Sequence, residues 1–198
     1  MMLRCGAVVL LGLLLLACGP ALRPATDELA RLDQERLQAL EQRSSWRASG
    51  RLSARDERDS GQLRFIWIQS PAMTEVRLMA PLGQGSWRLY VSADGALLED
   101  GDGRSDWAPE PEPLLRRHLG WSMPVGPLVG WLTGVPGEAA VDLVVADNGA
   151  PYAFVERGWQ VSYRGYVLVD DIALPRRVDV TAGEREARLL VSDWQWLD

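Results

Sequence analysis

The stretch that decides the fold is WRASGRLSARDERDSGQLRFIWIQSPAMTEVRLMAPLGQGSWRLYVS, residues 46–92. Within it, apolar and polar residues alternate with a period of two, as in β-strands that bury one face. The alternating runs are of strand length and are separated by turn residues such as Ser70-Pro71 and Asp94-Gly95; they cover residues 46–53, 62–69, 74–80 and 86–92. Short strands joined in this order predict an antiparallel meander.

The same pattern resumes after an interruption. Further strand-length runs cover residues 141–147, 152–157, 159–170, 176–183 and 186–196. The interruption, residues 106–138, is rich in Pro, Gly and Trp and predicts two short helices, 113–119 and 127–133. Each has a proline near its first turn and a glycine after its end. Because both are short and apolar, they suit a lid better than a pillar of the core.

A helix is also predicted before the first strand. Thr26 can cap it, acidic residues follow in its first turn, and leucines recur near helical spacing over residues 26–45. The chain is therefore expected to be mainly β, of the α+β kind. It should form one curved antiparallel sheet with one helical insertion before it and another in its middle. The length of 198 residues fits a single domain over residues 26–198.

The N-terminus has the pattern of a lipoprotein signal. Residues 1–17 carry one positive charge, Arg4, and then an apolar run that is too short for an ordinary spanning helix. The run ends in LLACG, which resembles the lipobox of bacterial lipoproteins, with Cys18 as the acylated first residue of the mature chain. Residues 18–25 would then be an acylated tether. Gly19, rather than Asp, favours delivery to the outer membrane; the alternative is a plain secretory signal with a chance cysteine.

Charge and cysteine content argue against several kinds of function. The net charge of −6 argues against nucleic acid as a partner, because phosphate binding needs basic patches. Removal of the signal takes Arg4 away and leaves −7, so net charge does not favour anionic lipid, and the acyl anchor is expected to hold the protein at the membrane. Cys5 leaves with the signal and Cys18 is acylated, so we expect no disulfide, thiol nucleophile or cysteine-ligated metal.

No motif indicates catalysis, a metal or a cofactor. The single histidine, His118, is expected to be an ordinary surface residue. The acidic run at residues 99–106 alternates aspartates as a calcium loop does, but Ser105 and Pro111 stand where an EF-hand needs Gly and Glu. The GQG at residues 83–85 lacks the third glycine and the context of a dinucleotide loop. We therefore predict a protein that is not an enzyme and binds neither metal nor cofactor.

Large apolar side chains remain as candidates for an interior surface. On the strands they alternate so as to face one side of the sheet, at Phe65, Trp67, Trp87 and Leu89. In the insertion they are Trp121, Met123, Leu128, Trp131 and Leu132. The pattern alone fits a plain core. It also fits the wall of an apolar cavity, because a curved sheet capped by short helices can enclose a ligand.

One apolar residue stands where a turn tip is predicted. The segment MAPLGQG, residues 79–85, places Leu82 between Pro81 and Gly83, and this spacing predicts a tight turn. Turn tips are usually polar and solvated. From the residues alone, Leu82 is either exposed or folded back onto the sheet.

The order of short motifs resembles a known family. After the lipobox and the helix come WRxxGR, FxW, APLG, GWxMPV, WLxGxPG, WxVxY and LPR, spread from Trp46 to the end of the sheet. Together they resemble the LolB family, outer-membrane lipoproteins that receive other lipoproteins from a periplasmic carrier and place them in the membrane. The resemblance covers essentially the whole mature chain.

The resemblance implies an unclosed antiparallel β-barrel around an apolar cavity, capped by short helices, that holds acyl chains. The expected cavity residues are Phe65, Trp67, Trp87, Leu89, Trp121 and Met123, and the expected lid residues are Leu128, Trp131 and Leu132. The expected membrane-insertion loop is Pro81, Leu82 and Gly83, with Leu82 exposed and needed to deliver cargo into the bilayer.

The implied partners are a LolA-like periplasmic carrier, lipoprotein acyl chains and outer-membrane lipid. The protein is expected to be a monomer on the periplasmic face of the bacterial outer membrane, anchored through Cys18. Two alternatives stay open: an outer-membrane lipoprotein that binds another lipid or hydrophobic ligand, and a structural lipoprotein whose tryptophans are plain core.

Overall fold

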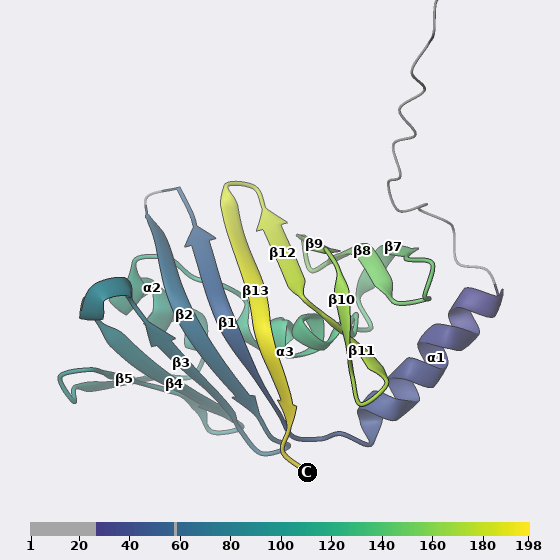
Figure 1. The fold of residues 1–198 in the computed structure, drawn as a ribbon. Helices are drawn as coiled ribbons and strands as arrows, with labels where there is room; N and C mark the ends of the chain where they lie inside the picture. The colour runs from purple at the N-terminus through teal and green to yellow at the C-terminus, as the bar shows by residue number, and fades with distance from the viewer. Residues whose placement is uncertain (1–26, 58) are drawn as a thin grey trace, which may run out of the picture.

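A computed structural model describes residues 27–57 and 59–198 of the chain. The predicted signal, tether and Cys18 lie outside these residues and remain predictions. The described part is dominated by one antiparallel sheet of eleven strands in the order β6-β5-β4-β3-β2-β1-β13-β12-β9-β8-β7 (Figure 1). A separate two-stranded sheet joins β10 to β11. The predicted mainly β architecture is confirmed.

The first half of the sheet is the predicted meander of four strands, extended by two further strands, β5 and β6. Its members are β1 (Trp46–Arg55), β2 (Ser60–Gln69), β3 (Thr74–Met79), β4 (Ser86–Ser92), β5 (Gly95–Asp100) and β6 (Ser105–Ala108). Each pairs with the next through a short turn. The sheet thus extends through β6, whose residues 106–108 belong to the segment in which the strand pattern was expected to stop.

The second half returns to the first through the C-terminal strand. It comprises β7 (Ala140–Val145), β8 (Pro151–Glu156), β9 (Trp159–Tyr163), β12 (Arg177–Ala182) and β13 (Arg185–Trp196). β13 pairs with β1 at ten positions, so the first and last strands in the sequence are neighbours in the middle of the sheet. Among the described residues no pairing joins the edge strands β6 and β7, and the barrel is therefore unclosed.

One predicted strand was wrong in extent. Residues 159–170 read as a continuous strand, but β9 ends at Tyr163 and β10 (Tyr166–Val169) turns away to pair with β11 (Ile172–Pro175). Gly165, at φ +75°, makes the break. Two backbone hydrogen bonds, Arg164 N–H to Arg177 O and Arg176 N–H to Gly165 O, close the base of the hairpin.

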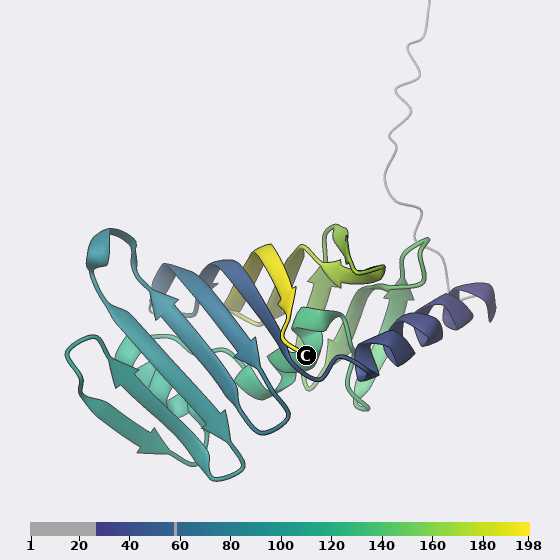
Figure 2. The ribbon, with the colours of Figure 1, turned by 60° about the horizontal axis from the view of Figure 1, so that its bottom comes forward.

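Three α-helices are described, α1 (Asp27–Glu41), α2 (Pro111–Leu119) and α3 (Val125–Thr133), and a short 3-10 helix, η1 (Pro81–Gly83), lies between β3 and β4. The predicted helices were 26–45, 113–119 and 127–133, so each was found with shifted ends. α2 shows why: its first turn accommodates Pro111, and it ends where Gly120, at φ +82°, donates its N–H to Arg116 O. Figures 1 and 2 place α2 and α3 against one side of the curved sheet and α1 beside the β10–β11 hairpin.

The two faces of the sheet differ in chemistry. Along β1, the side chains of Trp46, Ala48 and Leu52 are buried, while Arg47 and Arg51 point the other way. Gly50 sits at a β-bulge where an added Cβ would lie 2.0 Å from Leu190 O, so no larger residue fits. The inner face and the helices α2 and α3 share one continuous apolar core.

Candidate functional site

The strand residues predicted to face one side of the sheet do so. Phe65 lies opposite Leu78, which lies opposite Trp87; in the next row, Trp67 lies opposite Val76, which lies opposite Leu89. Phe65, Trp67 and Leu89 are buried, and Trp87 is partly buried against the same core. This part of the inner face is therefore an uninterrupted apolar surface.

The insertion residues complete that interior from the other side. Trp121, Met123, Leu128, Trp131 and Leu132 are all buried in the same cluster. The Trp131 ring lies 6.4 Å from Phe154 of β8 and 6.5 Å from Trp159 of β9, centroid to centroid, so α3 packs against the second half of the sheet. The side chains predicted as cavity and lid are thus brought together. Their role as the wall of an acyl-chain cavity remains a prediction.

The C-terminal end of α3 is held by polar side chains from three elements. Arg36 of α1 donates to Thr133 O at 3.1 Å and to Gly134 O at 2.7 Å. Tyr163 of β9 donates its hydroxyl to Trp131 O at 3.0 Å, and burial raises the pKa of that hydroxyl well above its usual value. This end of the lid is therefore fixed by several hydrogen bonds.

Glu156 of β8 adds a fourth tie. Its Oε2 accepts from Trp131 Nε1 at 2.8 Å and from Gly137 N at 2.9 Å, although the side chain is buried. Sequence reasoning missed Arg36, Tyr163 and Glu156, because each acts across a long sequence separation and none belongs to a local motif. The N-terminal end of α3 has one described side-chain tie of this kind, Val125 N to Glu112 Oε1 at 3.1 Å.

A pocket of about 430 Å³ opens at that less-tied end of the lid. Its apolar wall includes Val91 of β4, Met123, Pro127 and Trp159 of β9. Arginines surround this wall, at positions 116, 157 and 185, and Arg185 lies over the Trp159 ring at 4.7 Å. The pocket thus touches both halves of the sheet and both lid helices, and it is our candidate for the mouth of the interior.

The loop between β3 and β4 holds Leu82 out into solvent. Leu82 is 96% exposed and has a φ of +57°, a left-handed conformation that costs a residue with a Cβ about 1 kcal/mol or more. The loop is closed by Ala80 N–H to Gly85 O at 2.9 Å and by Gln84 N–H to Pro81 O at 3.2 Å. Gly85 passes over Trp87, whose ring would lie 2.6 Å from an added Cβ. The exposed alternative for Leu82 is the observed one.

The loop and the first helix lie far apart. Figures 1 and 2 place the β3–β4 loop at one end of the molecule and α1 at the other.

Within the described ranges, no helix has the length and apolarity that a bilayer crossing requires.

His118 is within hydrogen-bond distance of Asp106 rather than standing alone on the surface. Its Nε2 lies 3.0 Å from Asp106 Oδ2, and Arg117 contacts the same oxygen. The hydrogen bond from His118, with help from Arg117, lowers the pKa of Asp106. The pair ties α2 to β6 at the edge of the sheet, which is a structural role.

The acidic run at residues 99–106 is not a calcium loop. Asp100 accepts hydrogen bonds from the backbone N–H groups of Asp102 and Arg104 and from Arg104 Nε, so the acidic run is a hairpin turn. Across residues 27–57 and 59–198, no group of three His, Cys, Asp or Glu side chains is placed to hold a metal ion.

These features define a class of protein. An open antiparallel barrel with an apolar interior, closed by helices rather than by strands, is suited to hold an apolar molecule. The chain belongs to the outer membrane lipoprotein LolB family, whose family model matches residues 44–194.

Two relatives show how far the similarity extends. The chain is 36% identical to "Outer-membrane lipoprotein LolB" of Alkalilimnicola ehrlichii over 97% of its length and 98% of that protein. It is 34% identical to the protein of the same name from Pseudomonas syringae, over 82% of this chain and 80% of that one. Family membership confirms that the chain is an outer-membrane lipoprotein and not an enzyme.

A solved structure carries the same fold. A LolA superfamily protein from Nitrosomonas europaea matches with a TM-score of 0.52 at 10% sequence identity, covering 83% of this chain and 93% of that one. At that identity the likeness concerns the fold alone. It confirms the open barrel with its helical lid.

Proposed function

We propose that this protein receives lipoproteins from a LolA-like periplasmic carrier, holds their acyl chains in its interior and inserts them into the outer membrane. The observation that carries the proposal is the combination of a largely apolar interior under a lid with a leucine held 96% exposed on the β3–β4 loop. The first feature suits an acyl chain, and the second suits a bilayer.

The energetics of acyl chains explain why such a protein is needed. Three chains with about fourteen methylenes each would cost ~30 kcal/mol if left in water, at ~0.8 kcal/mol per methylene. Passing them from one apolar interior to another avoids most of this cost. The bilayer is then the final and better solvent.

The lid is the element that has to move, because Trp131 and Leu128 of α3 occupy the interior. Its C-terminal end is tied by Arg36 and Glu156, so opening is expected at the other end, beside the pocket of about 430 Å³. An acyl chain entering there would meet the apolar wall at Met123 first. The arginines around the mouth would face the polar part of the cargo.

The loop at Pro81, Leu82 and Gly83 supplies the contact with the membrane. One leucine buries only enough surface for ~2 kcal/mol, so Leu82 orients the mouth toward the bilayer rather than anchoring the protein. Acyl chains on Cys18 would provide the anchor, since stable attachment takes more than one lipid chain.

A transfer assay tests the proposal. The chain is made behind a cleavable secretion signal with Cys18→Ala and is mixed with the carrier of the same organism, loaded with a radiolabelled lipoprotein. We expect the label to move onto this protein. Label that stays on the carrier while the domain is folded would refute the receptor role, and uptake of a free apolar probe in that case would favour a carrier of another hydrophobic ligand.

A further inference from the structure

The outer face of the sheet carries a run of arginines beside the membrane loop. Arg51 of β1 and Arg64 of β2 lie directly opposite each other in the register, and both are exposed. No hydrogen bond or ion pair joins either guanidinium to another described side chain. Like charges placed opposite each other on neighbouring strands are destabilising, so these two arginines weaken the fold at this position.

The two arginines line a surface groove that reaches the loop. The groove has a volume of about 450 Å³, and its wall includes Arg51, Arg64, Arg188 of β13, Leu190 and Pro81. Leu190 is 40% exposed there, so the floor is partly apolar. We call this set of five residues the arginine groove. Through Pro81 it is continuous with the loop that presents Leu82.

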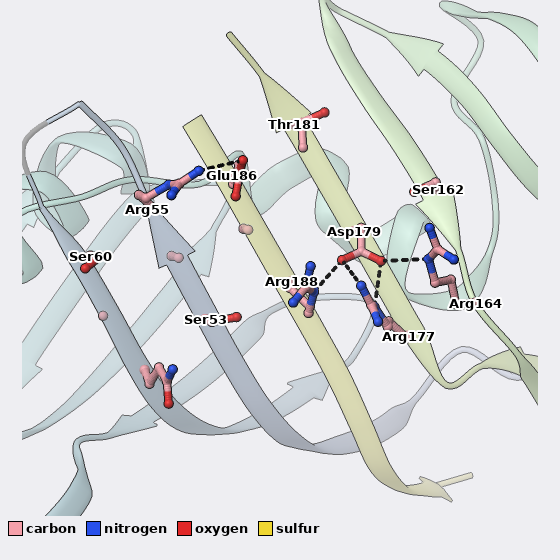
Figure 3. A pocket seen from close by; sticks show the side chains of 14 residues that line it. Ser53, Arg55, Ser60, Ser162, Arg164, Arg177, Asp179, Thr181, Glu186 and Arg188 are labelled. Atoms are coloured by element: carbon pink, nitrogen blue, oxygen red, sulfur yellow. Dashed lines mark hydrogen bonds and ion pairs between the residues drawn. The ribbon is translucent and has the colours of Figure 1, made fainter. Parts of the chain in front are cut away.

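A second groove, of about 520 Å³, continues from Arg188 across β12 (Figure 3). There four arginines, at positions 55, 164, 177 and 188, share the carboxylates of Asp179 and Glu186, so each arginine has an acidic partner. Asp179 accepts from Arg188 at 2.6 Å and from Arg177 at 2.7 Å, and Arg55 donates to Glu186 at 2.8 Å. Arg51 and Arg64, by contrast, form no ion pair with any carboxylate of the described residues, so their charge is left unmatched.

We propose that the arginine groove binds the phosphate groups of anionic phospholipids when Leu82 enters the bilayer. The inference rests on the proposed membrane role of the loop. We infer that the ligand is a lipid because the groove is continuous with that loop. A guanidinium also matches a phosphate group in geometry and charge. The chain as a whole is acidic, at −6, so this attraction comes from one patch and not from net charge.

The expected effect follows from the number of free arginines. A basic residue near an anionic membrane surface changes the bound-to-free ratio about fivefold, so the pair changes it on the order of 25-fold at low salt. High salt should remove most of the effect, because the screening length falls to about 3 Å at 1 M.

The experiment uses the full acylated protein, reconstituted by its own anchor into vesicles. A single thiol at Gln84→Cys, on the exposed side of the loop, carries a polarity-sensitive fluorophore. The vesicles contain phosphatidylcholine alone or with about 30 mol% phosphatidylglycerol, enough to charge the surface. We expect phosphatidylglycerol to increase the membrane-embedded fraction of the label, and Arg51→Gln with Arg64→Gln to abolish this increase while leaving the fold intact.

The matched control removes the same charge elsewhere. Arg31→Gln on α1, at the opposite end of the molecule, combined with Arg43→Gln just after that helix, should keep the response to phosphatidylglycerol. Lipid binding by the arginine groove is refuted if the Arg51 and Arg64 variant keeps the response to phosphatidylglycerol, or if the control loses that response equally. It is also refuted if the variant instead loses uptake of cargo from the carrier, which would make an acidic protein its partner.

The experiment distinguishes two errors: that the arginine groove does not bind lipid, and that the β3–β4 loop does not enter the membrane. A label embedded equally in both kinds of vesicle would overturn the arginine groove alone. A label that stays in water with every vesicle would overturn both proposals, and Leu82→Glu provides the reference signal for that state.

Discussion

Replacement of Leu82 by asparagine separates its role in function from any role in folding. The side chain is 96% exposed and the backbone is left-handed at φ +57°. Asparagine tolerates this conformation better than leucine does, and it removes the apolar group. A folded protein with an altered loop tip is therefore expected.

The magnitudes can be worked from the structure. Folding buries almost none of the Leu82 side chain, so its loss costs the fold nothing in buried area, and relief of strain should raise the unfolding free energy by up to about 1 kcal/mol. Transfer of the same side chain from water into a bilayer is worth ~2 kcal/mol. Leu82→Asn should therefore weaken loop insertion about 30-fold.

Two assays measure these effects on the same preparation. Urea denaturation gives the unfolding free energy, and release of a bound radiolabelled lipoprotein into phospholipid vesicles gives the delivery step. Uptake from the carrier is expected to be unchanged, because the loop lies outside the mouth. Leu82→Met is the matched control, since it keeps an apolar side chain of similar volume and should deliver normally.

Three results would refute the reasoning. Normal delivery by Leu82→Asn would show that the exposed leucine is not the membrane contact. A loss of stability of several kcal/mol would show that Leu82 packs against the protein. Loss of uptake from the carrier with intact release would place the loop at the carrier interface instead.

The remaining predictions concern the lid and the charged outer face. Glu156→Ala leaves the buried Trp131 Nε1–H donor unpaired and should lower the unfolding free energy by about 2 kcal/mol in urea titration; a loss below about 1 kcal/mol would contradict this. Arg36→Leu frees two carbonyls at the end of α3, so hydrogen exchange of the α3 amides should accelerate, and unchanged protection would count against the tie. For Asp179, burial disfavours ionisation, but Arg177 and Arg188 outweigh it and lower its pKa. Asp179→Asn should therefore cost stability, under about 1 kcal/mol given the exposure of the pairs, above the ordinary aspartate pKa of about 3.9. That difference should vanish as pH falls through the lowered pKa; a difference that persists in acid would contradict the assignment.

Most of the fold could be predicted because the period-two pattern is strong. The alternation in β1 and β2 sets which face is buried, since a slip of one residue would move every side chain to the other face. The split between β9 and β10 was missed because the run stays rich in apolar residues, although the spacing from Tyr163 to Tyr166 is three and shifts the phase of the alternation at Gly165. The pairing of β9 with β12, and of β10 with β11, then separates the two strands.

The candidate site was predictable in its apolar part and not in its polar part. Trp67, Trp131 and Met123 could be selected by pattern and position, and they are buried together. Arg36 and Glu156 could not be selected, because each reads as an ordinary charged surface residue of its own element. Their partners lie far away in the sequence, Gly134 for Arg36 and Trp131 for Glu156.

The exposure of Leu82 illustrates the same limit. The motif Pro-Leu-Gly predicts a turn, but it does not determine on which side the leucine points. That depends on the left-handed backbone at Leu82 and on the packing of Gly85 over Trp87, neither of which local propensity encodes.

The most direct test of the central claim is to find where a bound acyl chain lies. A lipoprotein bearing a photoreactive group near the end of an acyl chain is transferred onto this protein, irradiated, and the adducts are mapped by mass spectrometry. The account predicts adducts on inner-face and lid residues, such as Trp67, Met123 and Leu128, and none on outer-face residues such as Leu190. Adducts confined to the outer face or to the β3–β4 loop would contradict the claim that the interior under the lid holds the cargo.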